Sequence, residues 1–117
     1  MCDIKIKINN LEWEVCFVEC PNGINKLDIK DTDEHSLGLT RRSCDMILIN
    51  KDLPYDLMKR TVDHELVHAY LWSYGLSQFQ SFSEENVADF FETHARSILR
   101  DSRYILDKYK EAKNGTE

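Results

Sequence analysis

Residues 61–75 read TVDHELVHAYLWSYG, and the interpretation of the whole chain starts from this stretch. It contains the pattern H-E-x-x-H at His64, Glu65 and His68. In a helix, positions four apart lie on one face, one turn apart, so both imidazoles can reach one point. Two histidines in this arrangement are typical zinc ligands, and the glutamate between them is placed to act as a general base on a water molecule. The alternative is a pair of surface histidines on an ordinary helix.

The sequence around the motif predicts a helix over residues 52–75. Asp52 or Leu53 can cap its start, and Pro54 suits the first turn. Gly75 fits the position just beyond a helix C-terminus, where a left-handed backbone is needed. No proline or glycine lies between Pro54 and Gly75, so the motif is expected near the middle of an uninterrupted helix.

The composition limits the classes of protein to consider. A chain of 117 residues predicts a single domain, and the net charge of −6 argues against binding to nucleic acid or to an anionic membrane. No apolar run approaches the length of a membrane span, and the first ten residues lack the apolar region of a secretory signal. We therefore expect a cytoplasmic protein, with its oligomeric state open.

The four cysteines are Cys2, Cys16, Cys20 and Cys44. In a cytoplasmic protein they are expected to be free thiols. Cys16 and Cys20 are four residues apart, but an extended strand would separate them by roughly 13 Å, too far for one zinc ion. The cysteines therefore predict no structural metal site.

The N-terminal half of the chain predicts strands. Residues 4–8 and 11–17 alternate between apolar and polar side chains, and Asn9-Asn10 between them suits a tight hairpin turn. Lys5 and Lys7 would then face Glu12 and Glu14 across the hairpin. Further strands are expected at 37–41 and 44–49, with a short one around 27–29.

A second long helix is expected over residues 83–112, with Ser83 or a capping box of Ser81 and Glu84 at its start. Its core-facing stripe is expected to be formed by apolar residues at helical spacing together with one histidine: Val87, Phe90, Phe91, His94, Ile98 and Ile105. The predicted fold class is therefore α+β, with a small, mostly antiparallel sheet in residues 1–50 packed on two main helices.

A catalytic zinc ion needs a third protein ligand besides the two histidines. Glu85 is the preferred candidate, because Asp89, one turn later, can accept a hydrogen bond from a ligand histidine and fix its orientation. His94 is the competing candidate, although a histidine inside an apolar stripe is more often a core residue. Glu84 and Glu85 can also be read as ordinary acidic residues of a first helical turn.

Together, HELVHAY at residues 64–70 and EENVADFF at residues 84–91 resemble the motifs of gluzincin-type zinc metallopeptidases. The strand-then-motif layout before them is similar to small intracellular or phage-encoded members, including the ImmA/IrrE-like peptidases. The resemblance implies a zincin-like fold with zinc on His64, His68 and Glu85. It also implies that Glu65 is the general base and that Asp89 supports a ligand histidine.

The expected function is therefore zinc-dependent hydrolysis of peptide bonds, with Glu65 moving the proton. The residue that assists the oxyanion is left open among four candidates: Tyr70, Tyr74, His94 and Arg96. An exposed edge strand at 37–41 could align a substrate peptide by strand addition. The alternative function is a zinc-stabilised module that binds a protein partner without turnover.

Overall fold

In the computed structural model of this protein, residues 2–19, 37–76 and 83–115 are described. The chain begins with the expected hairpin, in which β1 (Ile4–Ile8) pairs antiparallel with β2 (Leu11–Val18). Asn9 and Asn10 both have positive φ angles, of 50° and 70°, as a two-residue turn with the twist of the strands requires. The register places Lys5 opposite Glu14 and Lys7 opposite Glu12, so the predicted arrangement of lysines facing glutamates across the hairpin is confirmed.

The second strand pair completes a four-stranded mixed sheet in the order β1-β2-β4-β3. β3 (Gly38–Arg41) is antiparallel to β4 (Met46–Asn50), whereas β4 runs parallel to β2. The predicted strand at 44–49 starts too early, because a 3₁₀ turn and the left-handed backbone of Asp45 reverse the chain before Met46. The short strand expected at 27–29 lies outside the described residues.

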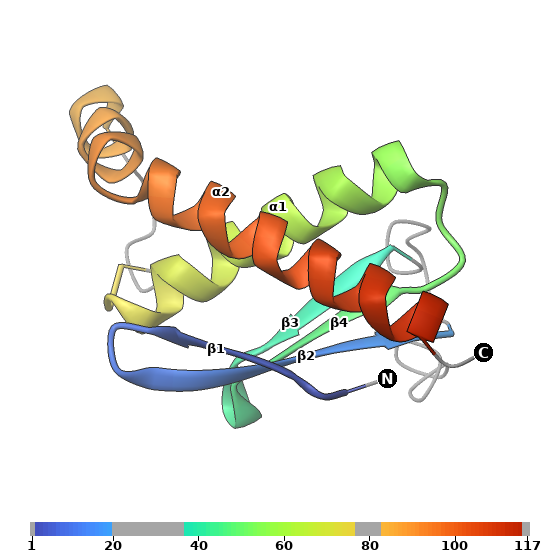
Figure 1. Cartoon of the computed structure of the whole chain (residues 1–117). Helices are drawn as coiled ribbons and strands as arrows, with labels where there is room; N and C mark the ends of the chain where they lie inside the picture. Colours follow the sequence, from blue (N-terminus) through green and yellow to red (C-terminus); the bar gives the residue numbers. More distant parts are fainter. Residues whose placement is uncertain (1, 20–36, 77–82, 116–117) are drawn as a thin grey trace, which may run out of the picture.

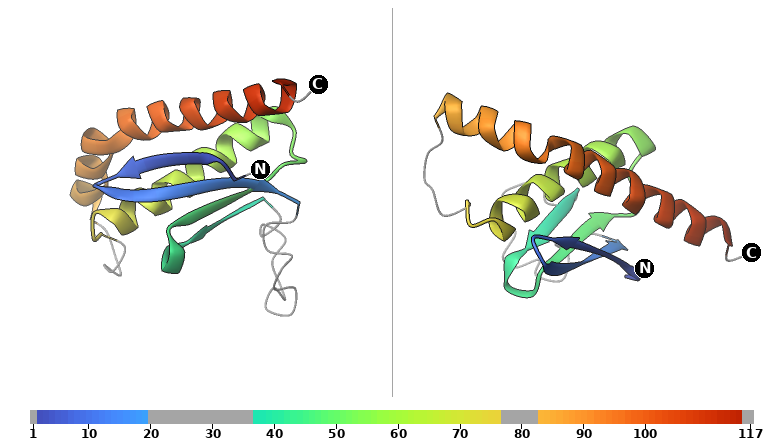
Figure 2. Two further views of the ribbon diagram at one scale, coloured as in Figure 1. Left: turned by 60° about the horizontal axis from the view of Figure 1, so that its bottom comes forward. Right: turned by 60° about the vertical axis from the view of Figure 1, so that its left-hand side comes forward.

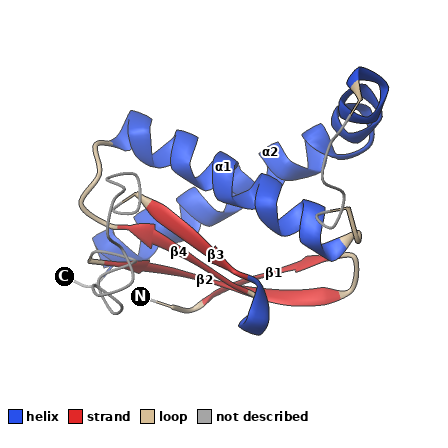
Figure 3. Ribbon diagram, turned by 180° about the vertical axis from the view of Figure 1, so that it is seen from behind, coloured by secondary structure: helices blue, strands red, loops and turns tan. Residues whose placement is uncertain are grey.

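Two helices cover one face of this sheet, α1 (Tyr55–Ser73) and α2 (Glu84–Gly115), which gives the predicted α+β class (Figure 1). Seen from behind, both helices again lie on the same side of the four strands (Figure 3). Within the described residues, no helix is both long and apolar enough to cross a membrane. The sheet edge formed by β3 lies beside α1, and this arrangement positions the candidate site.

The ends of α1 differ in how well the sequence predicts them. The expected cap at Asp52 or Leu53 is wrong, because the helix starts at Tyr55 with Pro54 as its cap residue and no side chain capping it. At the other end Gly75 has a φ angle of 74°, as predicted. Its backbone N–H donates to the carbonyl of Trp72, and the next N–H donates to Leu71, so the carbonyls of the last turn are satisfied.

The C-terminus of α1 is joined to the hairpin by two hydrogen bonds. The indole Nε1 of Trp13, a fully buried residue of β2, donates to Oγ of Ser73 at 2.8 Å. The side-chain amide of Asn9 donates to the backbone carbonyl of the same serine at 2.9 Å. These bonds satisfy polar groups that the core would otherwise leave unpaired. They also fix the position of the C-terminal end of α1 relative to the hairpin.

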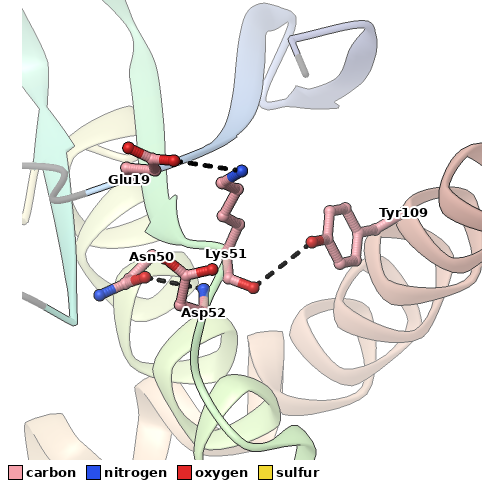
Figure 4. A network of polar contacts seen from close by, with 5 residues as sticks. All are labelled: Glu19, Asn50, Lys51, Asp52 and Tyr109. Carbon is pink, nitrogen blue, oxygen red and sulfur yellow. Dashed lines mark hydrogen bonds and ion pairs between the residues drawn. The ribbon is translucent and has the colours of Figure 1, made fainter.

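The C-terminal half of α2 runs back along α1 and ends near the connection between β4 and α1 (Figure 2). There the ring of Tyr109 stacks on Phe17 of β2 with 4.0 Å between centroids. Its hydroxyl donates to the carbonyl of Lys51 at 3.5 Å, and the ammonium of Lys51 pairs with Glu19 at 3.5 Å (Figure 4). One short connection is thus tied to both the sheet and α2.

The N-terminal turns of α2 extend beyond the C-terminus of α1 (Figure 2). Ser83 caps the helix, since its Oγ accepts a hydrogen bond from the N–H of Asn86 at 3.1 Å; the alternative at Ser81 lies outside the described residues. The predicted stripe is buried from His94 onward, but Val87 and Phe91 are 55% and 69% exposed. The expectation of a continuous core-facing stripe is therefore wrong for Val87 and Phe91, because α1 ends before it reaches them, whereas Phe90 is partly buried against the core.

The prediction of four free thiols is wrong for two of the cysteines. Antiparallel pairing brings Cys2, two residues before β1, beside the last part of β2, and the structure joins Cys2 to Cys16 in a disulfide. Cys44 is free and exposed in the turn after β3, whereas Cys20 lies outside the described residues. Cys16 is therefore engaged with Cys2 and is not part of a metal clip.

Candidate functional site

A cavity of about 590 Å³ lies between α1 and the edge strand β3. Its helical wall is formed by six residues whose spacing of three and four places them on one face of α1: Leu57, Arg60, Thr61, His64, Glu65 and His68. Its other wall is formed by Leu37, by the first three residues of β3 and by Arg42 in the following turn. All three residues of the H-E-x-x-H motif therefore line one cavity.

The two motif histidines come together at the cavity wall. The Nε2 atom of His64 lies 3.3 Å from the Nε2 atom of His68, and the rings are tilted edge to face. Two nitrogens bound to one tetrahedral zinc ion at about 2.0–2.1 Å are separated by about 3.3–3.4 Å. The separation of the two nitrogens therefore equals that of two adjacent ligands on a single zinc ion.

Glu65 is held in place by the edge strand. Its side chain is only 7% exposed, and the hydroxyl of Thr40 on β3 donates to the carboxylate Oε1 at 2.6 Å. The same hydroxyl lies 3.1 Å from the backbone carbonyl of Glu65. A carboxylate bound in this way has a fixed position at the cavity wall, as a general base requires.

The close approach of β3 to α1 depends on Gly38. A Cβ atom at this position would lie 2.8 Å from Cγ2 of Thr61 and 3.1 Å from Cγ of Glu65. The first distance is shorter than side-chain packing allows, so an added methyl group would push the strand and helix apart. The missing side chain of Gly38 thus allows Thr40 to reach the motif glutamate.

The surroundings of His68 favour its neutral form. Burial lowers the pKa of His68 below its usual 6.5; His64 and Arg42 lower it further, while Glu65 opposes them. A neutral imidazole has a free nitrogen lone pair, which is the form that binds a metal ion. At neutral pH no proton therefore has to leave His68 before metal binding.

The structure does not bring the other predicted site residues to this cavity. Glu85 and Asp89 are exposed on the first turns of α2. Nine residues of helix, roughly 13 Å, separate Glu85 from His94, which contacts Tyr70 of α1. Across residues 2–19, 37–76 and 83–115, no three His, Cys, Asp or Glu side chains are close enough to hold one metal ion. The role of Glu85 as third ligand stays a prediction.

His94, the competing third ligand, is buried among aromatic rings. Its imidazole lies 4.4 Å from the ring of Tyr74, 5.0 Å from Phe90 and 5.6 Å from Tyr70, measured between centroids. Burial lowers its pKa below 6.5. Tyr70 of α1 and Tyr74 just after it lie outside the cavity that the motif lines, and Phe90 is on α2 itself, so His94 serves the contact between the two helices.

The candidates for oxyanion stabilisation also lie elsewhere. Tyr70 is buried, and its hydroxyl donates to Oδ2 of Asp101 on α2 at 2.5 Å. Burial and this hydrogen bond raise the pKa of Tyr70 above its usual range. Tyr74 stacks on Tyr70, and Arg96 is exposed on α2. None of these side chains lines the cavity between α1 and β3.

Sequence reasoning missed four residues of the cavity: Gly38, Thr40, Arg42 and Arg60. The position of Arg60 could have been inferred, because it lies four residues before His64 on the same helical face. The other three depend on how closely β3 approaches α1, for which the sequence carries no local signal.

Together the fold and the site define an α+β domain in which an H-E-x-x-H helix lines a cavity against the edge of a four-stranded mixed sheet. Comparisons with known protein families, with curated proteins and with solved structures found no significant match to this chain.

Proposed function

We propose that this protein is a zinc-dependent metallopeptidase with a zincin-like arrangement of sheet edge and motif helix. The observation that carries the proposal is the separation of 3.3 Å between the Nε2 atoms of His64 and His68, beside the buried carboxylate of Glu65. A chance pair of surface histidines has no reason to combine this spacing with a fixed glutamate in the wall of a cavity.

His64 and His68 would hold the metal ion, with Glu85 as the predicted third ligand. Zinc bound there would act as a Lewis acid that polarises the scissile carbonyl and lowers the pKa of water. The donor set of two imidazoles and a carboxylate suits zinc. Because the two histidines already have the required spacing, metal binding needs little rearrangement of α1.

Glu65 would act as the general base and then as the general acid. Its carboxylate accepts the proton of the attacking water and delivers it to the leaving amine. Thr40 keeps one carboxylate oxygen occupied by a hydrogen bond, so the other oxygen is available for the proton. The buried position of Glu65 limits competing hydrogen bonds from bulk water.

β3 would align the substrate. It is the outer strand of the described sheet, paired with β4 on one side only, and three of its residues line the cavity. An extended peptide can add to such an edge through backbone hydrogen bonds. A peptide bound in this way would lie between the strand and the motif residues of α1.

The first test is the zinc content of purified protein, measured by mass spectrometry for the wild type and for single variants. We expect one zinc ion per chain, which is lost in His64→Ala and His68→Ala and retained in Glu65→Gln. Glu85→Ala is compared with Glu84→Ala, a matched exposed carboxylate on the same turn of α2. Loss of zinc in Glu85→Ala alone would support the third ligand, whereas equal zinc in both variants would remove Glu85 from the site.

The second test is cleavage of a mixed peptide library by zinc-loaded protein, read by mass spectrometry. We expect cleavage by the wild type and none by Glu65→Gln with its zinc retained. If wild-type protein that contains zinc cleaves no peptide, the proposal of a peptidase fails. A zinc-stabilised module that binds a protein partner would then be the better description.

A further inference from the structure

Two arginines line the cavity, at opposite ends of the motif. Arg60 lies one turn before His64 on the same face of α1. Arg42, in the turn after β3, lies beyond His68, with its guanidinium 5.6 Å from the ring centre of Trp72. Trp72 is one turn after His68, so the two cationic groups lie on either side of the histidine pair.

Neither guanidinium is neutralised by a carboxylate in the described part of the chain. The ion pairs there involve other cations, and the contact of Arg42 is with an aromatic ring. Both arginines are exposed, so they can bind an anionic ligand without breaking an ion pair seen among the described residues. Glu65 is the single carboxylate among the described residues of the cavity wall, and Thr40 already binds it.

The positive charge of this cavity is opposite to that of the chain as a whole, which has a net charge of −6. A cationic cavity in an acidic protein disfavours basic ligands and favours anionic ones at short range. The planar fork of a guanidinium matches a carboxylate in particular, because two parallel N–H groups meet its two oxygens. The ligand chemistry indicated is therefore an acidic side chain.

The spacing of the arginines sets where such side chains would lie. Arg60 and Trp72 are each six residues, or roughly 9 Å of helix, from the midpoint between His64 and His68. An extended peptide rises about 3.3 Å per residue, so this distance corresponds to two or three residues. We propose that the cavity selects peptides with Asp or Glu two or three residues to either side of the scissile bond, a proposal that rests on the peptidase function proposed above.

The test uses three pools of fluorescent decapeptides. In each pool two positions five residues apart carry the same residue, which is Glu in the first pool, Gln in the second and Lys in the third, and all other positions are mixed. Binding is measured by anisotropy to zinc-loaded Glu65→Gln, which does not cleave. Each exposed charge pair should increase the binding affinity about two- to five-fold. Two such pairs should therefore favour the Glu pool over the Gln pool by roughly four- to twenty-five-fold. The preference should fall as salt is raised, because exposed charges are screened.

Charge reversal then assigns the preference to the arginines. Arg60→Glu and Arg42→Glu, each added to Glu65→Gln, should reduce the preference for the Glu pool, and both together should favour the Lys pool. Arg103→Glu is the matched control, because Arg103 is exposed on α2 and outside the cavity wall. It changes the net charge equally and should leave the preference intact.

The outcomes separate this inference from the peptidase proposal. Equal binding of the Glu and Gln pools, or an equal effect of Arg103→Glu, overturns the acidic selection whether or not the wild type cleaves. Cleavage of the Glu pool by the wild type, centred between the two acidic positions, supports both proposals. Acidic preference in binding without any cleavage supports the role of the arginines and overturns the peptidase.

Discussion

Replacing Thr40 by valine tests whether the edge strand positions the general base. The substitution keeps the shape of the side chain and removes the hydroxyl that donates to Oε1 of Glu65 at 2.6 Å. A hydrogen bond to a charged group contributes about 1.5–3 kcal/mol, and each 1.36 kcal/mol in a barrier is about tenfold in rate. We therefore expect kcat/KM to fall roughly 10- to 150-fold, with most of the loss in kcat because Thr40 holds the base.

The assay is steady-state cleavage of one peptide identified from the library, with Thr40→Ser as the matched control. Serine keeps the donor, so most of the activity should return in that variant. Unchanged kcat in Thr40→Val, or equal loss in the serine variant, would refute the positioning role.

Three other predictions concern the scaffold of the site. Tyr70→Phe leaves the buried Asp101 carboxylate without its hydrogen bond from α1, and we expect a loss of about 1.5–3 kcal/mol in the free energy of unfolding, measured by urea denaturation. Burial lowers the pKa of His94, so the unfolded chain binds more protons than the folded chain below pH 6.5. The free energy of unfolding should therefore fall as the pH drops below that value. His94→Leu should reduce this dependence on pH, and an unchanged dependence would contradict the lowered pKa of His94. Gly38→Ala brings a methyl group within 2.8 Å of the Thr61 side chain. Thermal denaturation should show a loss of about 1–3 kcal/mol in the free energy of unfolding, and cleavage should slow because β3 shifts away from α1. Wild-type stability and cleavage rate in this variant would show that Gly38 does not hold β3 close to α1.

Local patterns explain which parts of the fold could be predicted. The hairpin follows from strict alternation and from Asn9-Asn10, whose side chains tolerate positive φ angles. The end of α1 follows from Gly75, and the shared face of the motif follows from helical spacing. Each of these signals is contained within a few neighbouring residues.

The parts that the sequence does not predict depend on contacts between distant segments. Nothing local specifies that β4 runs parallel to β2, or that β3 packs closely enough for Thr40 to reach Glu65. Helical periodicity predicts which face of α2 is apolar but not where that helix crosses α1. For this reason the apolar pattern predicts the burial of His94 correctly. It predicts burial for Phe91 as well, but that residue is exposed.

Apart from Phe90, the residues in the first turns of α2 are exposed and are free of the packing constraints that act on the rest of the helix. Val87 and Phe91 are exposed, and substitution of such residues changes stability by only about 0.5 kcal/mol. Screens that select for folding are therefore insensitive to the exposed positions of this segment, among them Glu85, Val87 and Phe91. Any sequence requirement that emerges there, at Glu85 or elsewhere, will be a requirement of what the protein binds or does.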